Sequence, residues 1–168
     1  MKNFSFSVPQ DIIVGAGSIK KLGECATKLG GTHALIISGP HLNKMGLVDT
    51  CKQSLADVGI PADAFTETEG NPSVETVEKA TKLYKECGAD FIVAFGGGSP
   101  MDAAKIIWLL YEHPECDFAD LAMDFMDIRK RVVTFPHLGE KAMFVCIPTS
   151  AGTGSEVTPF AIITDEKD

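Results

Sequence analysis

The sequence predicts an α/β domain built on a largely parallel sheet, and two observations support this prediction. Short apolar runs typical of buried strands alternate along the chain with segments of helical periodicity. Two of these runs lead into glycine-rich loops, which in α/β sheets often bind ligands. The 168 residues suffice for one domain with a substantial core, so we expect a single domain over residues 1–168.

The first expected elements are short strands followed by a helix. An alternating apolar pattern predicts a half-exposed strand over residues 4–8, and residues 12–14 predict a second, shorter one. A helix follows Ser18 and ends at Gly30, because glycine is common just after a helix. The apolar run over residues 33–38 then predicts a buried strand.

Two further helices and one short strand are expected next. The first of these helices ends at Gly59, and residues 62–66 predict a short strand after it. The second begins after Ser73, a favourable N-cap residue, and stops at Gly88. The apolar faces of the three helices comprise Ile19, Leu22, Ala26 and Leu29; Leu47, Cys51, Leu55 and Val58; and Val77, Ala80 and either Leu83 or Tyr84.

The stretch FIVAFGGGSPMDAAK, residues 91–105, joins a strand to a helix through three glycines. Residues 91–95 predict a strand buried on both faces, and the helix is expected from Met101 to about residue 113. Ser99 is expected to be its N-cap, with Asp102 completing a capping box. Residues 96–98 would then form the strand-to-helix turn.

This turn has the features of an anion site. Glycines let a ligand approach the main chain, and the following helix presents unpaired N–H groups and the positive end of its dipole. A phosphate group would fit there, although a tight structural turn without a ligand is the alternative. The pattern is neither a GxGxxG fingerprint nor a P-loop, because no Gly-Lys-Ser/Thr sequence follows.

A second glycine-rich loop, residues 148–159, lies between buried strands expected over residues 142–147 and 160–164. Thr153 and Glu156 form a second potential capping box. Both loops follow strands of one sheet, so we expect them to meet at the carboxyl ends of the strands. A polar surface loop without a ligand is the alternative. In the segment that precedes the strand at residues 142–147, the sequence predicts a helix around residues 118–126. The loop's hydroxyl groups, which suit phosphate and ribose oxygens, belong to Thr149, Ser150, Thr153 and Ser155.

Composition excludes several classes of function. The net charge of −8 argues against a nucleic-acid partner, and no apolar run is long enough to cross a membrane. Five scattered cysteines without a CxxC pair are typical of a cytosolic protein, so we expect a cytoplasmic location. The four histidines lack metal-ligand spacing, so we predict no metal ligands among them.

With these motifs in view, the chain resembles the iron-containing alcohol dehydrogenase family. The matching segments are GAGSIKKLG, GNPS, GGGSPMDAAK and PTSAGTGSEVTPFAIITD. Residues 111–142 resemble the alcohol dehydrogenase half of bifunctional aldehyde–alcohol dehydrogenases. The resemblance implies a Rossmann-like domain, as at the N-terminus of dehydroquinate synthase-like proteins. It also implies reversible hydride transfer between NAD or NADP and a short-chain aldehyde or primary alcohol.

The resemblance also implies which residues bind the cofactor. Gly97, Gly98 and Ser99 would hold its pyrophosphate, and Asp102 would belong to the same pocket. The rest of the dinucleotide would be lined by Asn71, Thr149, Ser150, Thr153 and Phe160. Many members carry an aspartate where this chain has Gly39, and a carboxylate there would repel a 2′-phosphate. Gly39 therefore favours NADP, or use of both cofactors, with Ser38, His41 or Lys44 near the phosphate. A loop glycine without consequence for the cofactor is the alternative.

Members of the family are about twice as long and carry a helical domain that binds iron or zinc. We therefore expect this chain to be the N-terminal, cofactor-binding part of a longer enzyme. It should hold neither catalytic residues nor metal ligands, and it should be inactive alone. A glycerol or propanediol dehydrogenase is one alternative, and a non-catalytic nucleotide- or phosphate-binding module is another. A third is an assembly module in which strands near residues 4–14 pair between chains. The resemblance further implies that the parent enzyme is a homo-oligomer.

Overall fold

The computed structural model describes residues 11–116, 118, 121 and 136–165. The strand expected over residues 4–8 lies outside this part, as does most of the helix expected over 118–126. Within it, four parallel strands form one sheet in the order β2-β1-β3-β4. The strands are β1 (Ala34–Ile37), β2 (Ala62–Phe65), β3 (Phe91–Gly96) and β4 (Met143–Pro148). The predicted α/β fold with a parallel sheet is confirmed.

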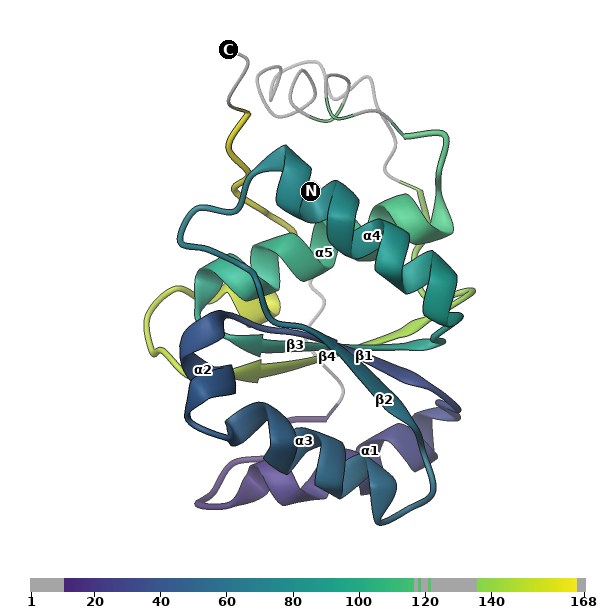
Figure 1. Cartoon of the computed structure of the whole chain (residues 1–168), viewed down its shortest axis with the longest axis vertical. Coiled ribbons are helices and arrows are strands. Elements are labelled where there is room, and N and C mark those ends of the chain that lie inside the picture. Colours follow the sequence, from purple (N-terminus) through teal and green to yellow (C-terminus); the bar gives the residue numbers. More distant parts are fainter. Residues whose placement is uncertain (1–10, 117, 119–120, 122–135, 166–168) are drawn as a thin grey trace, which may run out of the picture.

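Helices cover both faces of this sheet. Figure 1 shows α4 and α5 on one face and α1, α2 and α3 on the other. The α-helices are α1 (Leu22–Leu29), α2 (Pro40–Lys44), α3 (Leu47–Ala56), α4 (Val74–Cys87) and α5 (Gly98–Glu112). Two 3-10 turns, η1 (Ser18–Lys21) and η2 (Ser155–Val157), precede α1 and follow β4.

The hydrophobic core consists of two layers separated by the sheet. Because side chains alternate along a strand, Leu35 and Ile37 of β1 pack under α4 and α5, whereas Ile36 packs against α1 and α3. In β3, Ile92 likewise belongs to the layer under α4 and α5, and Val93 belongs to the layer against α1 and α3. Every residue of β1 and β3 is buried, which explains why their sequences are continuous apolar runs.

Several helix ends are confirmed where the sequence has a capping residue. Ser73 caps α4 by accepting a hydrogen bond from the backbone N–H of Thr76 at 3.2 Å. Gly30 and Gly88 end α1 and α4 in the left-handed conformation that glycine adopts easily. Leu29 and Val58, predicted to face inward, are instead 41% and 44% exposed, because each lies at or beyond the last turn of its helix.

Two expected strands are not present. Residues 12–14 are an exposed segment without strand structure, and no strand in the described part of the chain pairs with them. Residues 160–164 make only one bridge, between Thr164 and Ser73. Two other backbone groups of this segment bond to side chains of α5: Phe160 O accepts from Lys105 Nζ, and Ile162 N donates to Asp102 Oδ2.

The start of α5 also differs from the prediction. Its N-cap is Gly97, so Ser99 lies inside the first turn and is not the cap. Gly96, with a φ of 148°, lets β3 turn directly into the helix, which therefore begins before the serine. Asp102 consequently makes no capping box. Similarly, Gly154 and not Thr153 caps η2, without a side-chain hydrogen bond.

Candidate functional site

A cavity opens at the carboxyl ends of β1 and β3, the two strands between which the order of the sheet reverses. This is the place where open α/β sheets bind ligands. The cavity has a volume of about 410 Å³. Its lining residues are Gly39, Pro40, His41, Leu42, Thr68, Glu69, Gly70, Gly96, Gly97, Ser99, Pro100 and Thr149.

The amino end of α5 borders this cavity without a side-chain cap. Gly97 is the N-cap residue, and no side chain accepts a hydrogen bond from the first turn. The first N–H groups of a helix have no partner within the helix, and the helix dipole places partial positive charge there. The neighbouring helix α4 is different, because Ser73 caps it and Ser73 N donates to the Glu69 carboxylate at 2.9 Å. The free end of α5 is therefore suited to an anion.

The second glycine-rich loop packs directly on this helix end. Thr149 N donates to Gly96 O at 2.8 Å and so continues the pairing of β4 with β3. A Cβ atom on Gly97 would lie 3.3 Å from Ser150 Oγ, and one on Gly98 would lie 3.6 Å from Thr153 Cγ2. The two loops therefore meet at the carboxyl ends of the strands, as the sequence predicts, and glycine at position 97 permits this close approach.

Most of the residues proposed from the sequence lie in or beside the cavity. Gly39, Gly97, Ser99 and Thr149 line it. Asn71, which has a positive φ of 58°, donates its backbone N–H to Ser99 Oγ at 3.3 Å. Gly98, Ser150 and Thr153 surround the amino end of α5.

Asp102 and Phe160 occupy a neighbouring position and are not among the residues that line the cavity. Asp102 accepts hydrogen bonds from Ser155 Oγ at 2.5 Å and from Ile162 N at 3.2 Å. The Phe160 side chain is 61% exposed. Ser38, considered for phosphate binding, is completely buried, whereas His41 lines the cavity.

Sequence reasoning missed residues 68–70, which form one side of the cavity. They follow β2 and precede Asn71, so their place after a strand was the available signal. The Glu69 carboxylate accepts hydrogen bonds from Ser73 and Thr76 at the amino end of α4. Burial alone would raise the pKa of Glu69, but these hydrogen bonds outweigh it and hold the pKa below its usual range.

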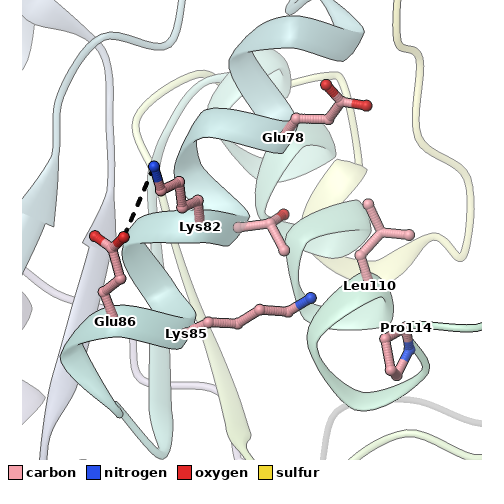
Figure 2. Close-up of a pocket in the computed structure, with 7 residues that line it drawn as sticks. Glu78, Lys82, Lys85, Glu86, Leu110 and Pro114 are labelled. Atoms are coloured by element: carbon pink, nitrogen blue, oxygen red, sulfur yellow. Dashed lines mark ion pairs between the residues drawn. The ribbon is translucent and has the colours of Figure 1, made fainter.

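A second cavity, of about 390 Å³, lies between α4 and the carboxyl end of α5. Figure 2 shows Lys85 reaching across it toward Leu110 and Pro114, while Lys82 faces Glu86 on the outer side of α4. Lys82 and Glu86 are 3.9 Å apart and largely exposed, so they form an ordinary surface pair. This cavity lies at the opposite end of α5 from the glycine turn.

The described residues contain no group of three or more His, Cys, Asp or Glu side chains that could hold a metal ion. The cysteines are free thiols, and burial raises the pKa of Cys51 to about 12 and that of Cys146 to about 11. Such thiols stay protonated at neutral pH and are poor nucleophiles. None of the helices that the structure describes is long and apolar enough to span a bilayer.

Comparisons with known proteins agree with the geometry. The family described as "Iron-containing alcohol dehydrogenase" matches residues 9–168. The bifunctional aldehyde-alcohol dehydrogenase of Escherichia coli is 44% identical over 160 residues, which are 95% of this chain and 18% of that protein. The NADPH-dependent butanol dehydrogenase of Clostridium saccharobutylicum is 41% identical over 163 residues, covering 96% of this chain and 39% of that protein.

A solved structure shows the same fold at similar coverage. The iron-containing alcohol dehydrogenase of Thermotoga maritima superimposes with a TM-score of 0.79 and 36% sequence identity, covering 98% of this chain and 43% of that one. The chain thus spans less than half the length of these proteins. From its sequence, its parallel sheet and its glycine-rich loops, it belongs to the iron-containing alcohol dehydrogenase family.

Proposed function

We propose that this chain is the dinucleotide-binding part of a metal-dependent alcohol dehydrogenase. The parent enzyme would transfer hydride reversibly between NADP(H) or NAD(H) and a short-chain aldehyde or primary alcohol. The observation that carries the proposal is the uncapped amino end of α5 beside a cavity, at the carboxyl ends of parallel strands. The names of two relatives, an aldehyde-alcohol and a butanol dehydrogenase, support the substrate class.

The residues around the cavity fit a dinucleotide. The backbone of Gly97, Gly98 and Ser99 would hold the diphosphate, because its N–H groups have no side-chain acceptor in the first turn. Hydroxyls of Thr149, Ser150 and Thr153 would bond further phosphate or ribose oxygens. When bound, the nicotinamide ring would supply or accept the hydride. The protein residues would hold it in place and exclude water from one side.

The environment of Gly39 supports a preference for NADP(H). Gly39 lines the cavity at the end of β1 and adds no charge, so a 2′-phosphate would meet no carboxylate from this residue. The Glu69 carboxylate lines the same cavity but accepts hydrogen bonds from Ser73 and Thr76 at the amino end of α4. His41, on the following turn, lines the same cavity and offers a hydrogen-bond donor. The butanol dehydrogenase relative is named as NADPH-dependent, which agrees with this preference.

We place the metal ligands outside the residues that the structure describes, because these residues gather no group of side chains suited to iron or zinc. A helical domain of the parent enzyme would supply the ligands and cover the side of the site near η2. Val157, Phe160 and Ile162 are 56%, 61% and 70% exposed there, which is the apolar surface such a domain would bury.

Calorimetric titration of the 168-residue chain with NADPH, NADH, AMP and inorganic phosphate tests the proposal. NADPH should bind more tightly than AMP or phosphate. The variant Gly98→Asp adds a carboxylate where the diphosphate would bind. Two unit charges about 4 Å apart at an effective dielectric constant of about 20 repel by roughly 4 kcal/mol, so NADPH binding should be abolished.

The matched control is Gln53→Glu, which adds one negative charge on the exposed face of α3, away from the cavity. It should leave NADPH affinity unchanged. Equal affinity for phosphate and NADPH would instead support a phosphate-binding module. No dinucleotide binding by the wild-type chain, or unchanged binding by Gly98→Asp, would overturn the proposal.

A further inference from the structure

Two oppositely charged side chains of α5 bind the loop after β4. Asp102 and Lys105 lie one turn apart, and each side chain is only 15% exposed. Their charged atoms are 3.5 Å apart. Both converge on Ser155, the first residue of η2, which is 5% exposed. An ion pair so far removed from solvent requires further hydrogen bonds to be stable, and Ser155 supplies part of them.

The hydroxyl of Ser155 connects the two charges. It donates to Asp102 Oδ1 at 2.5 Å and accepts from Lys105 Nζ at 2.9 Å. A hydroxyl can donate one bond and accept another, so both roles are satisfied together. Hydrogen bonds to charged groups are also stronger than neutral ones. Ser155 is therefore held firmly against α5.

The same two side chains bind the loop again beyond η2. Lys105 Nζ donates to Phe160 O at 2.6 Å, and Asp102 Oδ2 accepts from Ile162 N at 3.2 Å. Lys105 Nζ also lies 3.5 Å from Thr158 Oγ1, so residues 155–162 are attached to α5 at four positions, although they form no strand. The preceding residues Ser150 and Thr153 lie against the amino end of the same helix.

We propose that Asp102 and Lys105 are positioning residues for the dinucleotide site, an inference that rests on the proposed function. They hold the loop of residues 149–162 in the position that places Ser150 and Thr153 beside the diphosphate site. Neither charged residue lines the cavity, and both oxygens of Asp102 are bonded to protein groups. They act through the loop, and the ligand itself would contact the loop and the turn.

The fraction of time that the loop of residues 149–162 spends in its binding position should set the apparent affinity for NADPH. If the loop occupies its binding position for only a fraction of the time, the apparent affinity falls by that fraction. The variant Lys105→Met keeps a long apolar stem but removes the bonds of the ammonium group to Ser155, Thr158 and Phe160. We expect NADPH affinity to fall about tenfold and amide hydrogen exchange of residues 150–162 to accelerate about tenfold in the absence of ligand.

Three further variants complete the test. Lys105→Arg keeps the charge and should partly restore both the NADPH affinity and the slow amide exchange. Ser155→Ala removes only the connecting hydroxyl and should show the same two changes to a smaller degree, even if Lys105→Met does not fold. Lys85→Met, on α4 beside the second cavity and at the opposite end of α5 from the glycine turn, is the matched control and should change neither measurement.

The two measurements distinguish the possible outcomes. Faster exchange in residues 150–162 together with weaker NADPH binding supports the positioning role. Weaker binding without faster exchange would mean that Lys105 contacts the ligand, which overturns the inference. Unchanged exchange and unchanged binding would overturn it as well. If the wild-type chain binds no dinucleotide, the proposed function fails, and this inference about the site fails with it, whatever the exchange rates show.

Discussion

Replacement of Glu112 by glutamine should strongly destabilise the fold. Glu112 ends α5, is only 3% exposed, and turns its carboxylate toward the segment that leads into β4. The consecutive backbone N–H groups of residues 139–142 donate to it at 2.9 to 3.2 Å. The indole Nε1 of Trp108 adds a further bond at 3.0 Å. One side chain thus binds the polypeptide before β4 to the end of α5.

The expected cost follows from these bonds. Glutamine has the same shape, but its amide NH₂ replaces one acceptor oxygen and faces N–H groups that also donate. In the less costly orientation the NH₂ takes the place of Oε2, so Glu140 N loses its only acceptor while Gly139 N keeps Oε1 at 3.0 Å. An unsatisfied donor costs about 1–3 kcal/mol, so we expect a loss of about 2 kcal/mol in the free energy of unfolding at pH 7. Urea unfolding measures this loss. Glu86→Gln, in an exposed pair on α4, is the control and should cost less than about 1 kcal/mol.

At low pH, the wild type and the Glu112→Gln variant should differ less in their free energy of unfolding. Burial alone would raise the pKa of Glu112, but the bonds from Ala142 and residues 139–141 hold it below the ordinary value of 4.5. A carboxyl with a lowered pKa in the folded state stabilises fully above its unfolded pKa. That contribution is lost as pH falls below about 4.5 and through the lower folded value. A destabilisation under about 0.5 kcal/mol at pH 7, or one equally large in acid, would refute this reasoning.

Three other substitutions give separate tests. Gly96→Ala combines a φ of 148° with a Cβ 2.8 Å from Pro100 Cγ, so urea unfolding should show a loss of about 2 kcal/mol; wild-type stability would contradict this strain. Gly39→Asp places a carboxylate at the N-cap of α2, where aspartate is favourable, and fluorescence titration should show about tenfold weaker NADPH binding with NADH binding retained. An equal effect on both cofactors would argue against a 2′-phosphate there. Ser73→Ala removes the hydroxyl that accepts from Thr76 N and should cost about 1 kcal/mol in thermal or urea unfolding; no loss would mean that other residues replace the cap.

The sequence predicted the central sheet well because its strands are buried on both faces. A continuous apolar run as short as residues 91–95, bounded by turn residues, is typical of a parallel strand covered by helices. Helix ends at Gly30 and Gly88 were predictable because a left-handed residue is needed there and glycine supplies it. The meeting of the two glycine-rich loops was also predictable, since loops after neighbouring parallel strands must lie at one edge of the sheet.

The errors arose where side chains replace regular backbone pairing. Residues 160–164 have the composition of a strand, but Phe160 O and Ile162 N bond to Lys105 and Asp102, far away in the sequence. Glu112 looks like an ordinary surface charge at a helix end, and only the folded chain shows its bonds to residues 139–142. Residues 68–70 were missed because they carry no apolar pattern, and their only signal was their place after the strand that ends at Phe65.

The attachment of residues 155–162 to α5 by side chains has a consequence for how this enzyme family can diversify. The carboxyl ends of β1 and β3 are fixed by ladder bonds and by the core, so insertions there would disrupt the sheet. Residues 155–162 form no strand pairing that an insertion would disrupt, so the length of this loop can change while Asp102 and Lys105 remain. Natural variation in ligand preference among descendants of such a chain should therefore accumulate first in this loop.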